Sequence, residues 1–253
     1  MDNAAFTPDE MMTIAAARKL RDGDVCFVGI GKPSAAANLA RITHAPGVVL
    51  IYESGTIGAK PDVLPLSIGD GELADFAETV VSVPEIFRYW LQGGRVDVGF
   101  LGAAQIDKFA NLNTTVIGGS YDKPKVRLPG AGGAPEIASA AKEIWIIANH
   151  NKRMFVETLD FCTSAAGNSS RKRAPTTVIT DLCVMVADAS GELTLTGLHP
   201  GITVEQVQAA TGWDLKVAPT LNETPAPTTS ELASLRDLYT RTAAAHGTSG
   251  ESD

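Results

Sequence analysis

The chain has 253 residues, of which 44% are hydrophobic and 20% are charged, and its net charge is −8 at pH 7. This length and composition are typical of a globular protein with one large α/β domain or two small domains. An acidic chain lacks the basic face that nucleic acid requires, so we predict no nucleic-acid partner. No apolar run approaches the roughly 20 residues that span a bilayer, so we also predict no membrane association.

The cysteines and the start of the chain favour a cytoplasmic protein. The three cysteines, Cys26, Cys162 and Cys183, are far apart in the sequence, so we predict reduced thiols. Cys26 and Cys183 lie in apolar, strand-like runs, so we expect both to be buried. No two Cys or His residues have the spacing of metal ligands, so we predict no metal site. The first residues lack the basic start and apolar segment of a signal peptide. We therefore expect a cytoplasmic location.

A strand, a helix and a second strand are predicted near the N-terminus. Thr7, Pro8 and Glu10 form the capping box that begins a helix reaching about residue 21. A strand at 25–28 then leads through a tight turn into a helix at 35–41, and a second strand follows at 48–51. Because the crossover is short, we expect the two strands to be parallel.

Farther along the chain, strands first alternate with helices and then cluster. We expect strands at 79–83, 96–101, 114–117, 143–148, 153–158, 176–186 and 192–198, and helices at 86–92, 204–211 and 231–246. The strands at 143–148 and 153–158 could pair through a turn. This order predicts a single α/β domain over residues 1–246, with an open, mostly parallel sheet flanked by helices and extended by antiparallel strands. Residues 247–253 are expected to form a disordered tail.

The most informative segment is residues 48–55, where an apolar strand ends at Glu53 and is followed by Ser54 and Gly55. Open α/β sheets carry their chemistry at the carboxyl ends of the strands. A glutamate at that point could act as a nucleophile or a general base. It could equally be a solvated or salt-bridged surface residue, and these eight residues alone leave both interpretations open.

Two glycine-bearing segments could approach an anion. Gly29 and Gly31 lie between a strand and a helix, where backbone N–H groups attract negative charge, but neither the P-loop nor the dinucleotide fingerprint is complete there. The glycines at 130, 132 and 133 would let N–H groups converge on a phosphate or an oxyanion. Three cations precede them, namely Lys123, Lys125 and Arg127. A flexible surface turn with solvated charges is the alternative.

Polar residues follow the strand at 96–101. The Gln105 amide could donate a hydrogen bond to an oxyanion, although an ordinary polar loop residue is the alternative. Asn113 lies in a turn where its side chain can bond the backbone. The segment Gly-x-Ser-x-Gly is absent and the histidines have no partner in a recognisable frame, so a Ser-His-Asp triad has no support.

Taken together, these segments resemble the beta subunits of the family I CoA-transferases. Residues 51–55 resemble the active-glutamate strand, 29–33 an early glycine turn, 100–113 the second motif and 128–134 the third, in the same order and spacing over roughly residues 9–245. The resemblance implies the CoA-transferase fold, which is of the NagB/RpiA-like type. Within the family, the chain is most similar to the glutaconate CoA-transferase-like beta subunits. Residues 52–72 resemble the branch of that group that acts on 3-oxoadipate.

The resemblance implies a CoA-transferase of aromatic degradation that moves CoA from succinyl-CoA to 3-oxoadipate through a glutamyl-CoA thioester on Glu53. For the oxyanion of each step we expect the backbone amides of Gly130 to Gly133 as donors, Gly132 and Gly133 among them, and Gln105 as a second candidate. The resemblance implies contacts to CoA or the dicarboxylate substrate by other residues. These are Gly29, Gly31, Ser54, Gly55, Lys60, Gly102, Asn113, Arg127 and Gly130. Coenzyme A would be a substrate, with no further cofactor.

The resemblance also implies a separately encoded alpha subunit, an active site at the subunit interface, and an assembly of two alpha and two beta subunits or larger. Two other functions stay open. The transferase could act on glutaconate or another short dicarboxylate, or the enzyme could hydrolyse acyl-CoA. A regulatory beta subunit, in which Glu53 only shapes a partner's site, is a third alternative. Arg88, Lys60 and Arg127 are the cations that could bind the distal carboxylate of the substrate.

Overall fold

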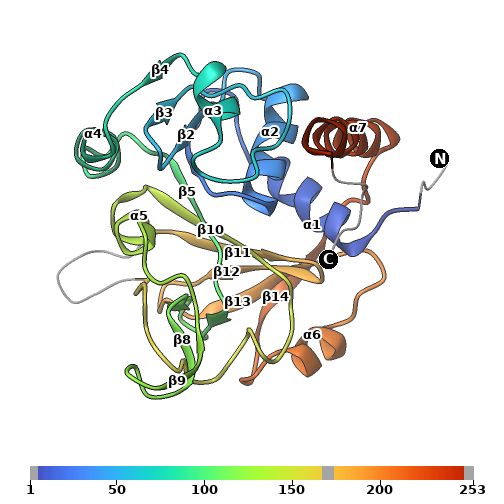
Figure 1. The fold of residues 1–253 in the computed structure, drawn as a ribbon. Coiled ribbons are helices and arrows are strands. Elements are labelled where there is room, and N and C mark those ends of the chain that lie inside the picture. The colour runs from blue at the N-terminus through green and yellow to red at the C-terminus, as the bar shows by residue number, and fades with distance from the viewer. Residues whose placement is uncertain (1–4, 167–173, 248–253) are drawn as a thin grey trace. The chain divides into compact units, whose positions relative to one another are not determined.

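The computed structural model describes residues 5–166 and 174–247, which fall into two compact units (Figure 1). The first unit contains the residues up to Asp97 and those from Ala226 onward, and the second contains Val98–Pro225. The predicted tail at 247–253 lies, except for Gly247, outside the described residues. The single domain over 1–246 stays a prediction.

The first unit is built on a sheet in the order β1-β2-β3-β4. Its elements are α1 (Pro8–Ala17), β1 (Val25–Val28), α2 (Lys32–Ile42), β2 (Val49–Tyr52), β3 (Thr56–Ile57), α3 (Gly71–Asp75), β4 (Thr79–Val80), α4 (Val83–Glu85), the π-helix η1 (Ile86–Leu91) and α7 (Thr229–His246). Strands β1 and β2 are parallel and α2 packs on β1, which confirms the predicted crossover. Strands β3 and β4 are added in antiparallel orientation.

Helices α1 and α7 are joined by the residues that cap them. Glu10 completes the predicted capping box of α1, and Glu231 completes that of α7. The Arg236 guanidinium of α7 donates two hydrogen bonds to Glu10, at 2.6 and 3.0 Å, and Arg18 donates two to Glu231, both at 2.6 Å. Each glutamate therefore fixes its own helix start and the contact with the other helix, which anchors the C-terminal helix to the first unit.

The second unit has a main sheet in the order β14-β13-β12-β11-β10-β5 and two separate hairpins, β6–β7 and β8–β9. Its elements are β5 (Val98–Leu101), β6 (Gln105–Ile106), β7 (Leu112–Asn113), β8 (Val116–Gly119), β9 (Pro124–Arg127), α5 (Ala134–Ala140), β10 (Glu143–Ala148), β11 (Thr176–Thr180), β12 (Cys183–Ala187), β13 (Leu193–Leu198), α6 (Val204–Ala210) and β14 (Lys216–Glu223). Strands β5, β10 and β11 are parallel, and β12 and β13 are added in antiparallel orientation.

The predicted strand at 153–158 is wrong. The Asn151 side chain accepts hydrogen bonds from the N–H groups of Arg153 and Met154, at 3.1 and 3.2 Å, and this turn takes up the groups that a strand would pair. Phe155 keeps only an isolated bridge to Ile106. The predicted strand at 176–186 is divided by a turn into the antiparallel strands β11 and β12.

The predicted α/β class is confirmed, with parallel strands, flanking helices and added antiparallel strands. Cys26 and Cys183 are buried as predicted, and Cys162 is exposed. Among the described residues, no helix is long and apolar enough to cross a membrane.

Candidate functional site

Strands β1 and β2 leave the sheet of the first unit side by side, and Gly29 follows one as Glu53 follows the other. The parallel register pairs Val28 with Tyr52, so the next residues along the two strands are Gly29 and Glu53. Glu53 is half-buried, and no hydrogen bond or ion pair is recorded for its carboxylate in the part of the chain that the structure describes. A carboxylate held at a strand end without a protein partner is suited to react with a ligand.

Gly55 gives the glutamate turn its shape. Its φ of +109° is a conformation that L side chains rarely adopt, and a Cβ atom added there would lie 2.0 Å from the carbonyl oxygen of Val81. The Val81 N–H in turn donates to the Gly55 carbonyl at 2.9 Å. The close approach holds the turn against the chain after β4, so Gly55 supports Glu53 through the backbone.

Two hydroxyl groups beside Glu53 are buried without a partner. The Oγ atom of Ser54 and the Oγ1 atom of Thr56 have no recorded hydrogen bond within the described residues. Unsatisfied buried polar atoms are rare, and they often mark a site whose ligand supplies the missing bond. Ser54, which the resemblance assigns to substrate contact, is therefore a candidate to meet a ligand.

A buried network that the sequence analysis missed holds the end of β2. The Tyr52 hydroxyl lies 2.9 Å from Ser34 Oγ and accepts a hydrogen bond from Asn38 Nδ2 at 3.3 Å. Burial raises the pKa of Tyr52, so the phenol stays neutral. Alternation along the strand puts Tyr52 on the opposite face from Glu53. Ser34 and Asn38 are one helical turn apart, and this spacing is the feature of the sequence that could have predicted the network.

Two other predicted residues of the first unit lie at its surface. Gly31 begins α2 with a φ of +80° and is exposed, so a glycine suits this turn. Lys60 is exposed and pairs with Glu78 at 2.8 Å. A surface ion pair of this kind is weak, but it gives Lys60 a partner within the chain.

In the second unit, the glycine loop at 130–133 is attached to Thr114, the residue directly after β7. The Gly130 N–H donates to the Thr114 carbonyl at 2.9 Å, and Thr114 Oγ1 donates to the Gly130 carbonyl at 2.8 Å. Gly130 therefore has no N–H to offer a ligand. For the N–H groups of Gly132 and Gly133, the structure records no acceptor among the described residues, so these two amides are the candidate oxyanion donors.

Gln105 and Asn113 form one network. The Gln105 amide donates to Asp160 at 2.8 Å, and its oxygen accepts from Asn113 Nδ2 at 2.7 Å. Asn113 also donates to Val116 and accepts from two backbone N–H groups, so its four hydrogen-bonding positions are used within the chain. The structure thus gives Asn113 a supporting role, next to the Thr114 that holds Gly130. Asp160, which the sequence analysis missed, orients Gln105.

The remaining predicted residues of this unit lie apart from that network. Gly102 follows β5 and is exposed. Arg127 lies in β9, where its guanidinium donates to the Tyr121 carbonyl at 2.5 Å and lies 4.8 Å from the centre of the Tyr121 ring. Arg127 therefore stabilises the tip of the β8–β9 hairpin.

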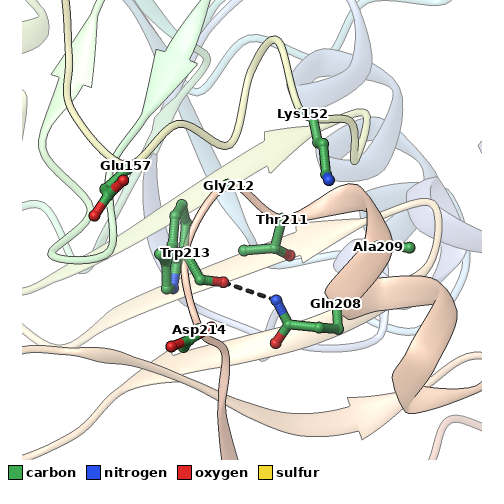
Figure 2. A pocket seen from close by; sticks show the side chains of 8 residues that line it. All are labelled: Lys152, Glu157, Gln208, Ala209, Thr211, Gly212, Trp213 and Asp214. Atoms are coloured by element: carbon green, nitrogen blue, oxygen red, sulfur yellow. Dashed lines mark hydrogen bonds between the residues drawn. The ribbon is translucent and has the colours of Figure 1, made fainter.

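A pocket of about 430 Å³ lies elsewhere in the second unit, beside α6 (Figure 2). Figure 2 shows the hydrogen bond of 2.8 Å from Gln208 to the Trp213 carbonyl that shapes one wall. None of the residues that line this pocket is a predicted site residue. Among the described residues, no group of three or more His, Cys, Asp or Glu side chains could hold a metal ion.

Comparison with known proteins identifies the family. Residues 9–210 match the model of the coenzyme A transferase family. The chain is 62% identical over 257 residues to a 3-oxoadipate CoA-transferase subunit from Pseudomonas knackmussii, with 98% of each chain covered. It is 33% identical over 250 residues to a glutaconate CoA-transferase subunit from Acidaminococcus fermentans, covering 91% of this chain and 92% of that one.

A solved structure agrees with these matches. The crystal structure of glutaconate CoA-transferase from Acidaminococcus fermentans is similar with a TM-score of 0.85 and 29% identity, over 93% of this chain and 95% of that chain. A matching family model, near full-length relatives and a shared fold give the same answer. The chain belongs to the coenzyme A transferase family.

Proposed function

We propose that this chain is the beta subunit of a CoA-transferase that moves CoA from succinyl-CoA to 3-oxoadipate. The observation that carries the proposal is the 62% identity to a 3-oxoadipate CoA-transferase subunit over 98% of both chains. The relative named for glutaconate is 33% identical, so the glutaconate alternative has less support. Acyl-CoA hydrolysis also has less support, because the relative at 62% identity is named as a transferase.

The proposed reaction is a relay of acyl transfers on Glu53. The carboxylate attacks the thioester carbonyl of succinyl-CoA, the carbon–sulfur bond breaks, and a mixed anhydride and the CoA thiolate form. The thiolate then attacks the Glu53 carbonyl carbon, which gives a glutamyl-CoA thioester and releases succinate. The carboxylate of 3-oxoadipate repeats these steps in reverse and leaves with CoA.

This relay needs no general base, because each attacking group is already an anion. Each addition does create an oxyanion, and losing one donor to an oxyanion typically slows a reaction by about 10²–10³. We assign that role to the N–H groups of Gly132 and Gly133, for which no acceptor is recorded among the described residues. Gln105 is a further candidate donor, oriented by Asp160.

The proposed assembly contains a separately encoded alpha subunit, since both relatives are named as one subunit of a larger enzyme. We propose two alpha and two beta subunits or a larger assembly, in the cytoplasm, with coenzyme A as a substrate and no other cofactor. Purification of the chain with its partner, followed by measurement of the mass in solution, tests the stoichiometry. Full transferase activity of the isolated chain would contradict the two-subunit proposal.

The test of the reaction is a trapping experiment on the assembled enzyme. We expect ping-pong kinetics with succinyl-CoA and 3-oxoadipate. Incubation with succinyl-CoA alone should accumulate the glutamyl-CoA thioester, which borohydride reduces although it does not reduce a carboxylate. Borohydride should therefore inactivate the enzyme only after succinyl-CoA is added, and mass spectrometry should place the change on Glu53. A preference of more than about tenfold for glutaconate with acetyl-CoA would overturn the substrate assignment.

A further inference from the structure

The hairpin of β8 and β9 carries an unusual concentration of positive charge. Residues 116–127, which we call the basic hairpin, contain Lys123, Lys125 and Arg127 and a single acidic residue, Asp122, whereas the chain as a whole has a net charge of −8. The hairpin is drawn in green in the second unit (Figure 1). All three cations are exposed. An acidic protein that binds an anionic substrate needs such a local region of opposite potential.

The strand geometry puts two of the cations on one open face. Lys125 and Arg127 are two residues apart in β9, so their side chains leave the same side of the strand. The antiparallel register pairs Val116 with Arg127 and Ile117 with Val126, so Gly118 lies opposite Lys125. A Cβ atom at Gly118 would lie 2.9 Å from the Lys125 side chain. The glycine therefore leaves the face beside Lys125 clear of a β8 side chain.

The lysines of the basic hairpin differ in their pairing from three other lysines of the chain. Lys32, Lys60 and Lys216 each form an ion pair with a carboxylate. Neither Lys123 nor Lys125 has a recorded side-chain partner among the described residues. Arg127, by contrast, is held by the Tyr121 carbonyl and ring, so it keeps the hairpin tip in place. The two lysine ammonium groups thus remain available to an anion.

The basic hairpin is also attached to the segment that carries the glycine loop. The Leu128 N–H, directly after β9, donates to the Thr115 carbonyl at 3.0 Å. The neighbouring Thr114 holds Gly130 through its two hydrogen bonds. The hairpin and the loop with the candidate oxyanion donors are therefore two parts of one anchored segment, which suits a long ligand with its phosphates at one end and its reacting carbonyl at the other.

We propose that the basic hairpin binds the phosphate groups of the substrate's coenzyme A, with Lys123 and Lys125 as the phosphate contacts and Arg127 as a positioning residue. This inference rests on the proposed function, because it assigns the phosphate-bearing end of the same substrate. Lysine binds phosphate as a point charge without strict geometry, which fits Lys125 on the exposed face of β9 and the exposed Lys123 directly before that strand. The contacts would contribute equally to substrate and transition state, so they affect KM and leave kcat unchanged.

The test uses the double variant Lys123→Gln/Lys125→Gln in the enzyme assembled with its partner subunit. We expect the KM for succinyl-CoA and the Kd for CoA to rise about tenfold or more, since hydrogen bonds to charged groups are lost, while kcat changes by less than about twofold. With succinyl-pantetheine, which carries the thioester but no phosphates, the variant and the wild type should have equal KM values. Lys142→Gln, which removes an exposed charge from the same unit, is the control and should change neither substrate's KM.

Four results would overturn the inference. The first two are an unchanged KM for succinyl-CoA and an equal rise with succinyl-pantetheine. The third is loss of subunit assembly in the double variant, which would make the hairpin a protein interface. The fourth is binding of inorganic pyrophosphate as tight as that of CoA, which would indicate a general anion site. If the wild type binds CoA through the hairpin but transfers none to 3-oxoadipate, the proposed function fails and the inference stands.

Discussion

Thr114 and Gly130 are joined by two hydrogen bonds that run in opposite directions. The Gly130 N–H donates to the Thr114 carbonyl at 2.9 Å, and the Thr114 hydroxyl donates to the Gly130 carbonyl at 2.8 Å. The Thr114 N–H donates in turn to Thr163 Oγ1 at 2.9 Å. Thr114 is thereby bonded both to Thr163 and to Gly130, the first residue of the glycine loop, and Gly132 and Gly133 follow Gly130 in that loop.

The first prediction concerns this attachment. Thr114→Val keeps the shape of the side chain but removes the donor to Gly130, so the loop should lose part of its fixed geometry. We expect kcat for CoA transfer to fall about tenfold, because small misplacements of catalytic groups are costly. The free energy of unfolding should fall by only about 1 kcal/mol, the usual value of one hydrogen bond. Thr114→Ser restores the donor and should recover most of kcat. Equal kcat values for the valine variant and the wild type would refute the positioning role.

The second prediction concerns Glu53. Glu53→Ala should abolish transfer, and Glu53→Asp should lose transfer while keeping residual hydrolysis of acyl-CoA, because the carboxylate is drawn back by one methylene and a misplacement near 1 Å can cost about 10²-fold. Because the Glu53 carboxylate has no recorded protein partner among the described residues, the melting temperature of both variants should stay within about 2 °C of the wild type. Near-normal transfer by the alanine variant would remove Glu53 from the mechanism.

The third prediction concerns Gly55. Gly55→Ala forces a Cβ atom to within 2.0 Å of the Val81 carbonyl oxygen and requires an L residue at a φ of +109°. The backbone must move, so we expect a loss of about 2–4 kcal/mol in the free energy of unfolding, together with loss of transfer as Glu53 shifts. Gly71→Ala in α3 is the control, since a Cβ atom there meets nothing within 4 Å. Urea unfolding of both variants checks the prediction, and equal stabilities would contradict it.

The fourth prediction concerns acid stability. His150 is buried, stacks on Phe155 with ring centres 3.9 Å apart, and lies 2.9 Å from Thr211 Oγ1. Burial lowers the pKa of His150 from 6.5 to about 4, because the charged form is poorly solvated there. The unfolded chain therefore takes up a proton first, so this contribution to stability is complete above pH 6.5. It is lost as the pH falls from 6.5 towards 4.

The loss should amount to about 3 kcal/mol at pH 4, at roughly 1.4 kcal/mol for each pKa unit. His150→Gln keeps a hydrogen-bonding side chain but does not titrate in this range. Urea unfolding at several pH values should therefore show a smaller decrease in stability for the variant than for the wild type between pH 6.5 and 4. Parallel curves for the two proteins would show that His150 is not a source of acid sensitivity.

The features that follow from short-range sequence were available without the structure. The capping boxes at Glu10 and Glu231, the crossover from β1 to β2 and the position of Glu53 at a strand end depend on spacings of a few residues. Such spacings determine local hydrogen bonds and the face on which a side chain lies. The motifs around Glu53 and the glycine loop also identified the family, which the comparisons confirmed.

Only the tertiary structure decided which of the candidate groups already have partners. Lys60 is paired with Glu78, the Asn113 side chain is fully hydrogen-bonded within the chain, and Gly130 gives its N–H to Thr114. It also showed that an Asn151 turn replaces the predicted strand at 153–158. In the first three cases the folded chain brings the hydrogen-bond or ion-pair partner near. In the fourth, the Asn151 turn competes with an apolar pattern in 153–158 that fits a strand equally well. A hydrogen bond uses up a donor wherever its acceptor lies, so sequence determined which groups could react, and folding determined which of them remain free to do so.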